Sequence, residues 1–359
     1  MKYVIPSVVF AVSFALVACA DESHESKDAV GLGAESALPR RRSSIVIDGC
    51  GVDPWQRSTL ANPATKKVVN GGDLIFLCLV PRADGTIGPR DDSANARIKA
   101  LAQDLHAEGY RVHLAVSFTD ETGEVYDGAQ TAASLTKPEW RARFLQTLPD
   151  HLDGIDGIEL DLLNAPNSAQ RDITELVSAI DLVVRPTHKL GIFMPPILQS
   201  GDLPGVGDAI SRLDVAPHVD RMRIMTLDYS DDYQSPGPTI DPGWAVEALR
   251  SATITNRPLD IAYPLYGNDF GPRGLRLVTY AEAVASGGKI VRGPTGAPYV
   301  SWYGFNGEAH QTWFDDAEST GAALGAWAPP TLAEDVGVLF YGFGAEDPNL
   351  WDRLASRMP

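Results

Sequence analysis

Two carboxylates at alternating positions of an apolar segment are the residues of this chain best placed to do chemistry. The segment GIDGIELDLLNAP spans residues 154–166, and in a β-strand its side chains Glu159, Asp161 and Leu163 would share one face. Acids are costly to bury in such surroundings, so they are usually paired, hydrogen-bonded or placed at the end of a barrel strand, where active sites form. The alternatives are a solvated edge strand, or two acids that hydrogen-bond inside the fold and bind no ligand.

Length and composition indicate a globular protein with one large domain or two. The chain has 359 residues, of which 44% are hydrophobic and 21% are charged, as in ordinary soluble proteins. Its formal net charge of −17 argues against nucleic acid or an anionic surface as the partner, because both require clustered Lys and Arg. A neutral ligand fits this charge better, although acidity also keeps a secreted protein soluble.

The N-terminus is typical of an export signal. Lys2 precedes an apolar run over residues 4–17, which is too short for a comfortable membrane span. The tetrad LVAC, which ends at Cys19, resembles a bacterial lipobox. This resemblance implies cleavage before Cys19, lipidation of its thiol and a membrane anchor at the cell envelope, and Ala20 after the cysteine favours the outer membrane. The alternative is a plain signal peptide that is cut nearby.

The expected organisation is a lipoprotein signal peptide over 1–18, a flexible tether over 19–43 and one folded domain over 44–359. If Cys19 is lipidated, Cys50 and Cys78 remain. An exported location permits a disulfide between them, but two buried free thiols are equally compatible with the sequence. No CxxC or Cys/His pattern occurs, so the sequence predicts no metal and no cofactor.

Eight short apolar strands alternate with helical patterns in the folded domain. This alternation predicts parallel βαβ units that close into a (β/α)8 TIM barrel, with Thr136 and Asp241 among the helix caps. The strands are expected near 45–48, 74–80, 112–117, 157–163, 191–195, 222–227, 259–264 and 337–343. More than seventy residues separate the last two strands, so residues from about 268 to 314 are expected to form a small α+β lobe between strand seven and helix seven.

Four segments at barrel-strand spacing resemble signatures of glycoside hydrolase family 18, the chitinase-like barrels. DGIELDLLN resembles the family's DGxDxDxE, RIMTLDYS its MxYDY, IAYPLYG its GxPxYG, and GVLFYGFGAED its closing GxxxWxxxxD. The resemblance covers most of residues 44–356 and implies substrate-assisted hydrolysis of a β-linked N-acetylated sugar. In that reaction the N-acetyl oxygen attacks the anomeric carbon, the middle Asp orients the acetamido group, and the Glu protonates the departing oxygen.

The chain departs from this pattern where the resemblance places the chemistry. By position, Glu159 replaces the first Asp, Asp161 matches the middle Asp, and Leu163 occupies the place of the acid. Leucine cannot donate a proton, and general acid catalysis is worth about 10² to 10⁴-fold. Leu227 stands where the family has a Tyr that contacts the acetamido group, and Tyr341 replaces the usual Trp. Glu159 and Asp161 could still share a proton and supply a displaced acid.

Aromatic rings and acids near the expected strand ends are candidate sugar contacts, because flat rings pack on pyranose faces. The candidate substrate-binding residues are Asp228, Tyr229, Tyr266, Tyr341 and Trp302. Leucine at the acid position also occurs in the chitinase-like lectins, which this chain therefore resembles. The expected function is recognition of a glycan with N-acetylglucosamine, such as chitin or peptidoglycan, with hydrolysis lost or impaired. The alternatives are an active glycosidase that uses Glu159 and Asp161, and an envelope scaffold that binds no glycan.

Overall fold

The computed structural model describes residues 37–359 apart from 91–93, 120–127, 163–164, 197–211, 231–234, 328–331 and 334. The lipobox-like cysteine Cys19 and Leu163, at the position of the family's acid, therefore lie outside the described residues. None of the helices in the described part of the chain combines the length and the apolar character that a membrane span requires.

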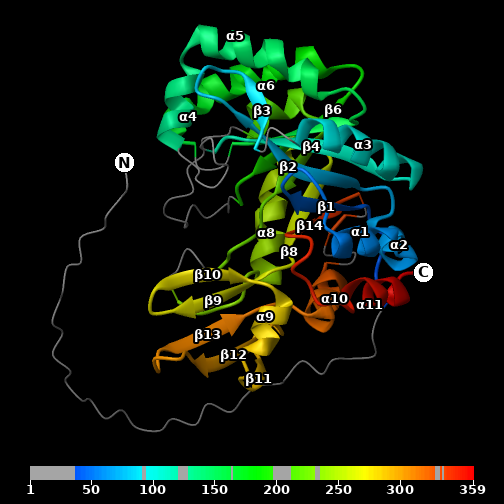
Figure 1. The fold of residues 1–359 in the computed structure, drawn as a ribbon, viewed down its shortest axis with the longest axis vertical. Helices are drawn as coiled ribbons and strands as arrows, with labels where there is room; N and C mark the ends of the chain where they lie inside the picture. Colours follow the sequence, from blue (N-terminus) through cyan, green and yellow to red (C-terminus); the bar gives the residue numbers. More distant parts are fainter. Residues whose placement is uncertain are drawn as a thin grey trace, which may run out of the picture. The chain divides into compact units, whose positions relative to one another are not determined.

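Eight parallel strands close into a barrel (Figure 1). β1 (Ser43–Asp48) pairs with both β14 (Gly337–Tyr341) and β2 (Asp73–Pro81). The first strand therefore bridges the last strand and the second, which closes the sheet. The circuit is completed by β4 (Arg111–Ser117), β5 (Gly157–Asp161), β6 (Lys189–Met194), β7 (Arg221–Ile224) and β8 (Leu259–Pro264). The short β3 (Ile87–Pro89) pairs antiparallel with β2 outside this circuit. The predicted (β/α)8 barrel is confirmed.

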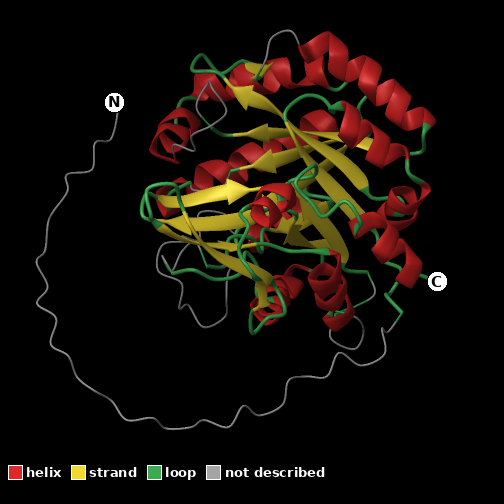
Figure 2. Ribbon diagram, turned by 60° about the horizontal axis from the view of Figure 1, so that its bottom comes forward, coloured by secondary structure: helices red, strands yellow, loops and turns green. Residues whose placement is uncertain are grey.

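Helices cover the outside of the strands (Figure 2). They are α1 (Pro54–Ala61), α2 (Pro63–Val69), α3 (Ala94–Ala107), α4 (Gly128–Leu135), α5 (Pro138–Thr147), α6 (Gln170–Val184), α7 (Arg212–Val215), α8 (Pro242–Ala252), α10 (Ala317–Ala326) and α11 (Leu350–Arg357). Asp241 caps α8 as predicted, since its side chain accepts a hydrogen bond from the Trp244 backbone. Thr136 does not cap α5: its hydroxyl donates to the Ala133 carbonyl of α4, and Lys137 holds the cap position.

Two apolar clusters on either side of the sheet build the core. In β5, Ile158 and Leu160 belong to the large cluster between the strands and the helices, whereas Glu159 and Asp161 point into the barrel. A smaller cluster fills the barrel interior, and its members are Val46, Ile75, Leu77, Ala115, Phe193, Met225, Ala262 and Leu339. The alternation expected for this strand is therefore present, and both acids are almost completely buried.

The expected α+β lobe is inserted after β8. It consists of β9 (Gly267–Gly271), β10 (Gly274–Val278), α9 (Tyr280–Ala285), β11 (Ile290–Arg292), β12 (Pro298–Tyr303) and β13 (Ala309–Trp313). The five strands form an antiparallel sheet in the order β10-β9-β13-β12-β11, seen below the barrel in Figure 1. Ala283 of α9 packs on this sheet against Val278 and Val300, which gives the lobe its own small core.

A buried carboxyl fastens the end of the lobe to the barrel. Asp315 follows β13 and accepts hydrogen bonds from Tyr263 of β8 (2.8 Å), Ser319 of α10 (2.8 Å) and Thr239 (3.2 Å). Burial raises the pKa of Asp315 to about 6, although these three hydroxyls partly offset the effect. The carboxyl at this junction therefore holds its proton to a higher pH than an ordinary aspartate does.

A disulfide ties the first two barrel strands together at their carboxyl ends. Cys50, just after β1, is bonded to Cys78 of β2, 28 residues away. Of the two possibilities that the sequence left open, the structure has the bonded pair rather than two free thiols.

Candidate active site

Four of the residues predicted from the sequence gather at the carboxyl end of the barrel strands, here called the mouth. Asp161 ends β5 and Tyr341 ends β14, while Asp228 and Tyr266 follow β7 and β8. Active sites of parallel barrels form at this end. Burial raises the pKa of Tyr341 far above its ordinary value, and the negative charges of Asp161, Asp48 and Asp228 raise it further. The Tyr341 hydroxyl thus lies within the electrostatic influence of three carboxylates.

Asp228 and Tyr266 hold each other in place within this group. The Tyr266 hydroxyl donates a hydrogen bond of 2.7 Å to Asp228 Oδ1. The Tyr266 ring meets that of Tyr341 edge-on, with centroids 6.5 Å apart. Asp228 has a left-handed backbone with φ of 56°, which Asp tolerates better than most residues. The bond therefore fixes a carboxylate on a backbone conformation that is uncommon outside glycine.

The mouth also contains an ion pair that the sequence analysis missed. Asp48 ends β1 and lies 2.9 Å from Arg90 Nη1. The backbone nitrogen of Arg90 donates to the Cys78 carbonyl, so this pair stands beside the Cys50–Cys78 disulfide. An acid as the last residue of a predicted strand was the available signal for Asp48. Arg90 gave none, because the short strand before it was not predicted.

Two other predicted sugar contacts, Tyr229 and Trp302, pack against neighbouring rings. The Tyr229 ring lies 5.2 Å from that of Trp244 on α8. The Trp302 ring stacks on His310 at 4.1 Å, and its Nε1 donates to Thr312 within the lobe sheet. Both rings therefore have packing partners close to them in the structure.

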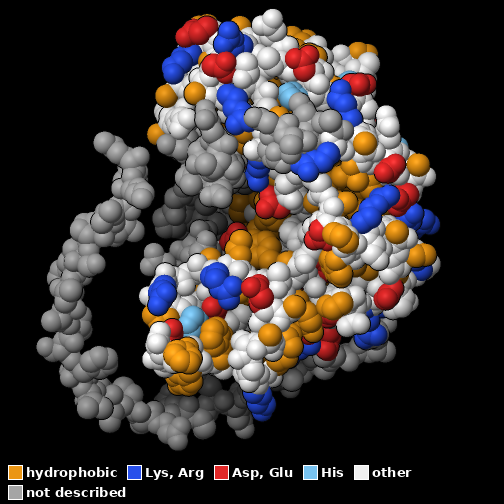
Figure 3. Space-filling view, viewed as in Figure 1, with side chains coloured by type: hydrophobic (Ala, Val, Ile, Leu, Met, Phe, Trp, Pro, Cys, Tyr) orange, Lys and Arg blue, Asp and Glu red, His pale blue; other side chains and the backbone are white. Residues whose placement is uncertain are grey.

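The mouth combines acidic side chains with an apolar surface beneath them. Leu227 and Tyr341 pack against the apolar cluster inside the barrel. Only two residues separate the end of β8 from the first strand of the lobe, so the lobe stands beside the mouth. Figure 3 shows the molecule hollowed next to the lobe, with hydrophobic and acidic side chains visible in the hollow. Rings, apolar surface and fixed carboxylates are what a sugar site requires.

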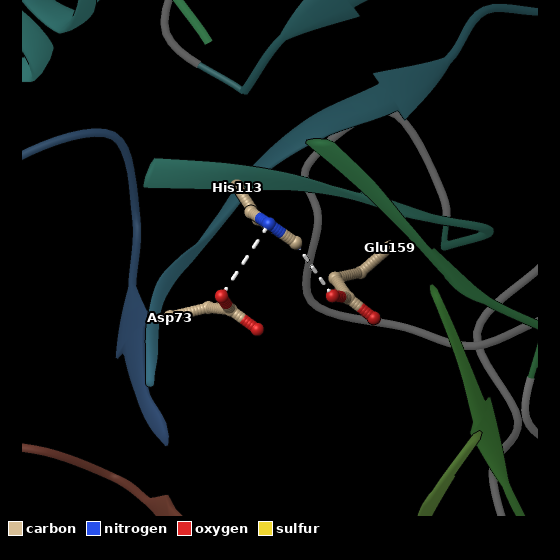
Figure 4. Close-up of side chains that lie close together, drawn as sticks. All are labelled: Asp73, His113 and Glu159. Atoms are coloured by element: carbon tan, nitrogen blue, oxygen red, sulfur yellow. Dashed lines mark hydrogen bonds and ion pairs between the residues drawn. The ribbon is translucent and has the colours of Figure 1, made fainter. Parts of the chain in front are cut away.

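Glu159 points away from the mouth, into a buried ionic group that we call the floor cluster: Asp73, His113, Glu159, Arg223 and Asp260. Figure 4 shows His113 between the carboxylates of Asp73 and Glu159. Its Nδ1 lies 2.8 Å from Glu159 Oε1. Asp73 is the first residue of β2 and Asp260 the second of β8, so the cluster occupies the amino end of the barrel.

Arg223 is the centre of the floor cluster. Its Nη2 donates to Asp73 Oδ2 (2.7 Å) and to Glu159 Oε1 (2.6 Å), and its Nη1 donates to Asp260. Burial alone would raise the pKa of Glu159, but the charge of Arg223 and the hydrogen bonds from His113 and Arg223 hold it below its ordinary value. Glu159 is therefore an ionised structural carboxylate here, a poor proton donor for chemistry at the mouth.

The floor cluster contains three side chains of the types that bind metal ions. Among the described residues, Asp73, His113 and Glu159 offer ligand atoms within 4.8 Å of one another. The Arg223 guanidinium already binds both carboxylates of this group, and Arg111 Nε donates to the other oxygen of Asp73 at 2.9 Å. A divalent cation would face these positive charges at close range. The arginines thus take the place that a metal would need.

The chain matches no family profile and no curated protein sequence. Solved structures are similar to it in fold. The Bacillus cereus spore cortex-lytic enzyme SleL superposes with a TM-score of 0.71 at 17% identity, over 91% of this chain and 76% of that one. A class V chitinase from Pseudomonas fluorescens superposes with a TM-score of 0.70 at 18% sequence identity, over 87% of this chain and 98% of that one. A glycoside hydrolase family 18 N-acetylglucosaminidase from Paenibacillus barengoltzii superposes with a TM-score of 0.65 at 14% sequence identity, over 89% of this chain and 100% of that one. The fold is therefore that of the chitinase-like barrels.

Proposed function

We propose that the chain recognises a β-linked glycan containing N-acetylglucosamine at the mouth of its barrel, and that hydrolysis is lost or impaired. The observation that carries this proposal is the convergence of Asp161, Asp228, Tyr266 and Tyr341 at the carboxyl ends of four strands. The barrel has the fold of chitinases, which supports a glycan as the ligand class. Rings that pack on a pyranose and carboxylates that accept from its hydroxyls supply the contacts.

Loss of hydrolysis follows from the residues available as an acid. Leu163 stands at the position of the family's acid in the sequence. Glu159, the displaced acid of the alternative proposal, is completely buried and its pKa is lowered by Arg223. Without a proton donor, an alkoxide leaving group departs about 10² to 10⁴-fold more slowly.

The test is calorimetric titration of the protein with chitin oligomers and with muropeptides, followed by product analysis of the same samples. We expect saturable binding with intact oligomers, weakened at least tenfold by Asp228→Asn because a charge-assisted hydrogen bond is worth about 1.5 to 3 kcal/mol. Asp352→Asn on α11 removes the same charge at an exposed site and is the matched control. Cleavage abolished by Glu159→Gln in a folded protein would instead establish an enzyme with a displaced acid.

One observation favours the scaffold alternative. Leu227 and Tyr341 pack against the apolar cluster inside the barrel, and Leu227 stands where the family has a Tyr that contacts the acetamido group, so one expected polar contact with the sugar is missing. A scaffold would bind neither class of oligomer. Absence of binding to both ligands would therefore favour this second function.

For its location, we propose export and a lipid anchor on Cys19 at the bacterial envelope, in the outer membrane. The motif LVAC and the short apolar run before it support this proposal. Cys19→Ser should release the protein from the membrane fraction and abolish incorporation of labelled palmitate. Retention of both in the variant would refute the anchor.

A further inference from the structure

The chain enters its folded domain at the amino end of the barrel strands, opposite the mouth. Leu38 precedes β1, and its backbone nitrogen donates a hydrogen bond of 2.8 Å to the Arg357 carbonyl of α11. Arg41 is almost completely buried, and its guanidinium donates to the carbonyls of Trp327 and Val336, both at 2.8 Å. These contacts fix the place at which the residues before Leu38 leave the folded domain.

A lipid on Cys19 would therefore hold the domain by its amino end. Ala37, the first described residue, follows Cys19 by 18 positions. A fully extended chain covers at most about 3.6 Å per residue, so the lipid would lie within about 65 Å of Ala37. The mouth lies at the other end of the strands.

Cations surround this amino end. Arg111 and Lys189 are the first residues of β4 and β6, and their side chains are 45% and 66% exposed. Lys67, in the last turn of α2, is exposed and donates to the Met358 carbonyl near the end of the chain. We call the following residues the amino-end cations: Arg40, Arg42, Lys67, Arg111, Lys189 and Arg221.

The carboxylates that pair with these cations lie beneath them. Asp73, the partner of Arg111, has no exposed side-chain surface, and neither has Asp260. Asp220 lies 3.1 Å from the Lys189 ammonium group and is 23% exposed, against 66% for the lysine. Solvent at this end therefore meets the cations before it meets their partners.

The two ends of the barrel differ in charge. The mouth carries Asp48, Asp161 and Asp228, of which Asp48 is 78% exposed. At the amino end, the exposed acid Asp153 before β5 is paired with Lys99 at 3.2 Å. In a chain of net charge −17, an anionic surface attracts the amino end and repels the mouth.

We propose that the amino-end cations contact anionic phospholipid headgroups of the membrane that carries the anchor, so that the mouth faces away from that membrane. The proposal rests on the lipid anchor proposed above for Cys19, which brings this end to the membrane. Headgroup phosphates accept charge-assisted hydrogen bonds from guanidinium and ammonium groups. Each Lys or Arg near an anionic surface strengthens binding about fivefold, so several of them together hold this face in place.

The test labels the lysines of the lipid-modified protein in vesicles. One preparation contains phosphatidylcholine alone and the other adds an equal part of phosphatidylglycerol, so the anchor holds in both and only the surface charge differs. Acetylation by an N-hydroxysuccinimide ester, followed by mass spectrometry, should modify Lys67 and Lys189 about fivefold or more slowly on the anionic vesicles. Lys289 on the lobe is also exposed and should be modified equally on both. Salt at about 1 M should abolish the protection, because it screens exposed charges beyond about 3 Å.

A chain that starts at Ala20 tests the surface without the lipid, because it lacks Cys19 and keeps every described residue. At low salt it should float with anionic vesicles and not with phosphatidylcholine vesicles. Arg40 is exposed and bonds the Asn70 side chain (3.0 Å), so Arg40→Gln should leave the barrel folded and weaken this binding about fivefold. Arg273→Gln removes the same charge from the exposed turn between β9 and β10 and should change nothing.

Two outcomes would overturn this proposal. Equal modification of Lys189 on both kinds of vesicle, together with no flotation of the shorter chain on anionic vesicles, would show a face that does not bind headgroups. Protection of Lys289 in place of Lys189 would show that the lobe faces the membrane instead. Absence of the full chain from both kinds of vesicle refutes only the anchor, and flotation of the shorter chain still decides this inference.

Discussion

Replacing Asp315 by Asn is expected to stabilise the protein at neutral and alkaline pH. The pKa of this carboxyl rises from its ordinary value of 3.8 to about 6 in the folded chain. At about 1.4 kcal/mol per tenfold change in proton affinity, ionising it in the folded state costs about 3 kcal/mol. Because the raised pKa belongs to the folded state, the protonated carboxyl favours folding fully below pH 3.8. That contribution is lost as the pH rises through about 6.

Asparagine avoids this cost because it cannot ionise, and the hydroxyls of Tyr263, Ser319 and Thr239 can each reverse their roles to bond an amide. We therefore expect Asp315→Asn to match the wild type near pH 4 and to exceed it by about 3 kcal/mol near pH 8. For a chain of this size the difference raises Tm by about 4 °C. Scanning calorimetry of both proteins across this pH range measures it.

Asp316, the adjacent residue, supplies a matched control of opposite sign. Its carboxylate is partly buried, caps α10 and pairs with Arg292, and these contacts lower its pKa although burial opposes them. A lowered pKa stabilises the fold above the unfolded pKa, so Asp316→Asn should lose stability near pH 8 and little near pH 4. An Asp315→Asn protein no more stable than the wild type near pH 8 would refute the assignment of a buried, destabilised charge.

Three further outcomes can be measured. Arg223→Met should lower the free energy of unfolding by about 3 to 5 kcal/mol in urea titrations, because it leaves three buried carboxylates without their shared partner; a loss under about 1 kcal/mol would contradict this. Cys50→Ser should cost about 3 kcal/mol by opening the loop closed at Cys78, and dithiothreitol should lower the wild-type Tm but not that of the variant. Tyr266→Phe removes the hydrogen bond to Asp228 and should weaken binding of chitin oligomers about tenfold in a protein that still folds; unchanged binding would argue against Asp228 as a sugar contact.

The barrel and its lobe were predictable because local patterns determine them. Short apolar strands and helical segments alternate along the chain, and the long interval before β14 indicated an insertion. Alternation in β5 also gave the correct inward direction of Glu159 and Asp161. However, the alternation of side chains does not show how far along the barrel axis each inward-facing residue lies. Glu159 precedes Asp161 by two residues and so points to the floor cluster, whose other members come from distant strands.

Aromatic candidates were the least predictable part of the site. Tyr341 ends a strand and Tyr266 follows one, and the two rings meet at the mouth. Tyr229 and Trp302 instead pack against the rings of Trp244 and His310. A ring that packs and a ring that binds look the same in a sequence, because both occur in apolar segments near strand ends. The helix caps show the same limit: Thr136 had the residue type of a cap, but its hydroxyl bonds to the preceding helix.

The position of Arg223 bears on the order in which this chain can fold. Its partners Asp260, Glu159, Asp73 and Ser44 lie 37, 64, 150 and 179 residues away, on four different strands. No half of the barrel contains all of them, so a partial chain would bury charges without their partners. We therefore expect the ion pairs of Arg223 to form late in folding, once strands from both halves of the barrel have assembled. Unfolding of the barrel should accordingly be cooperative, with little stability in any fragment.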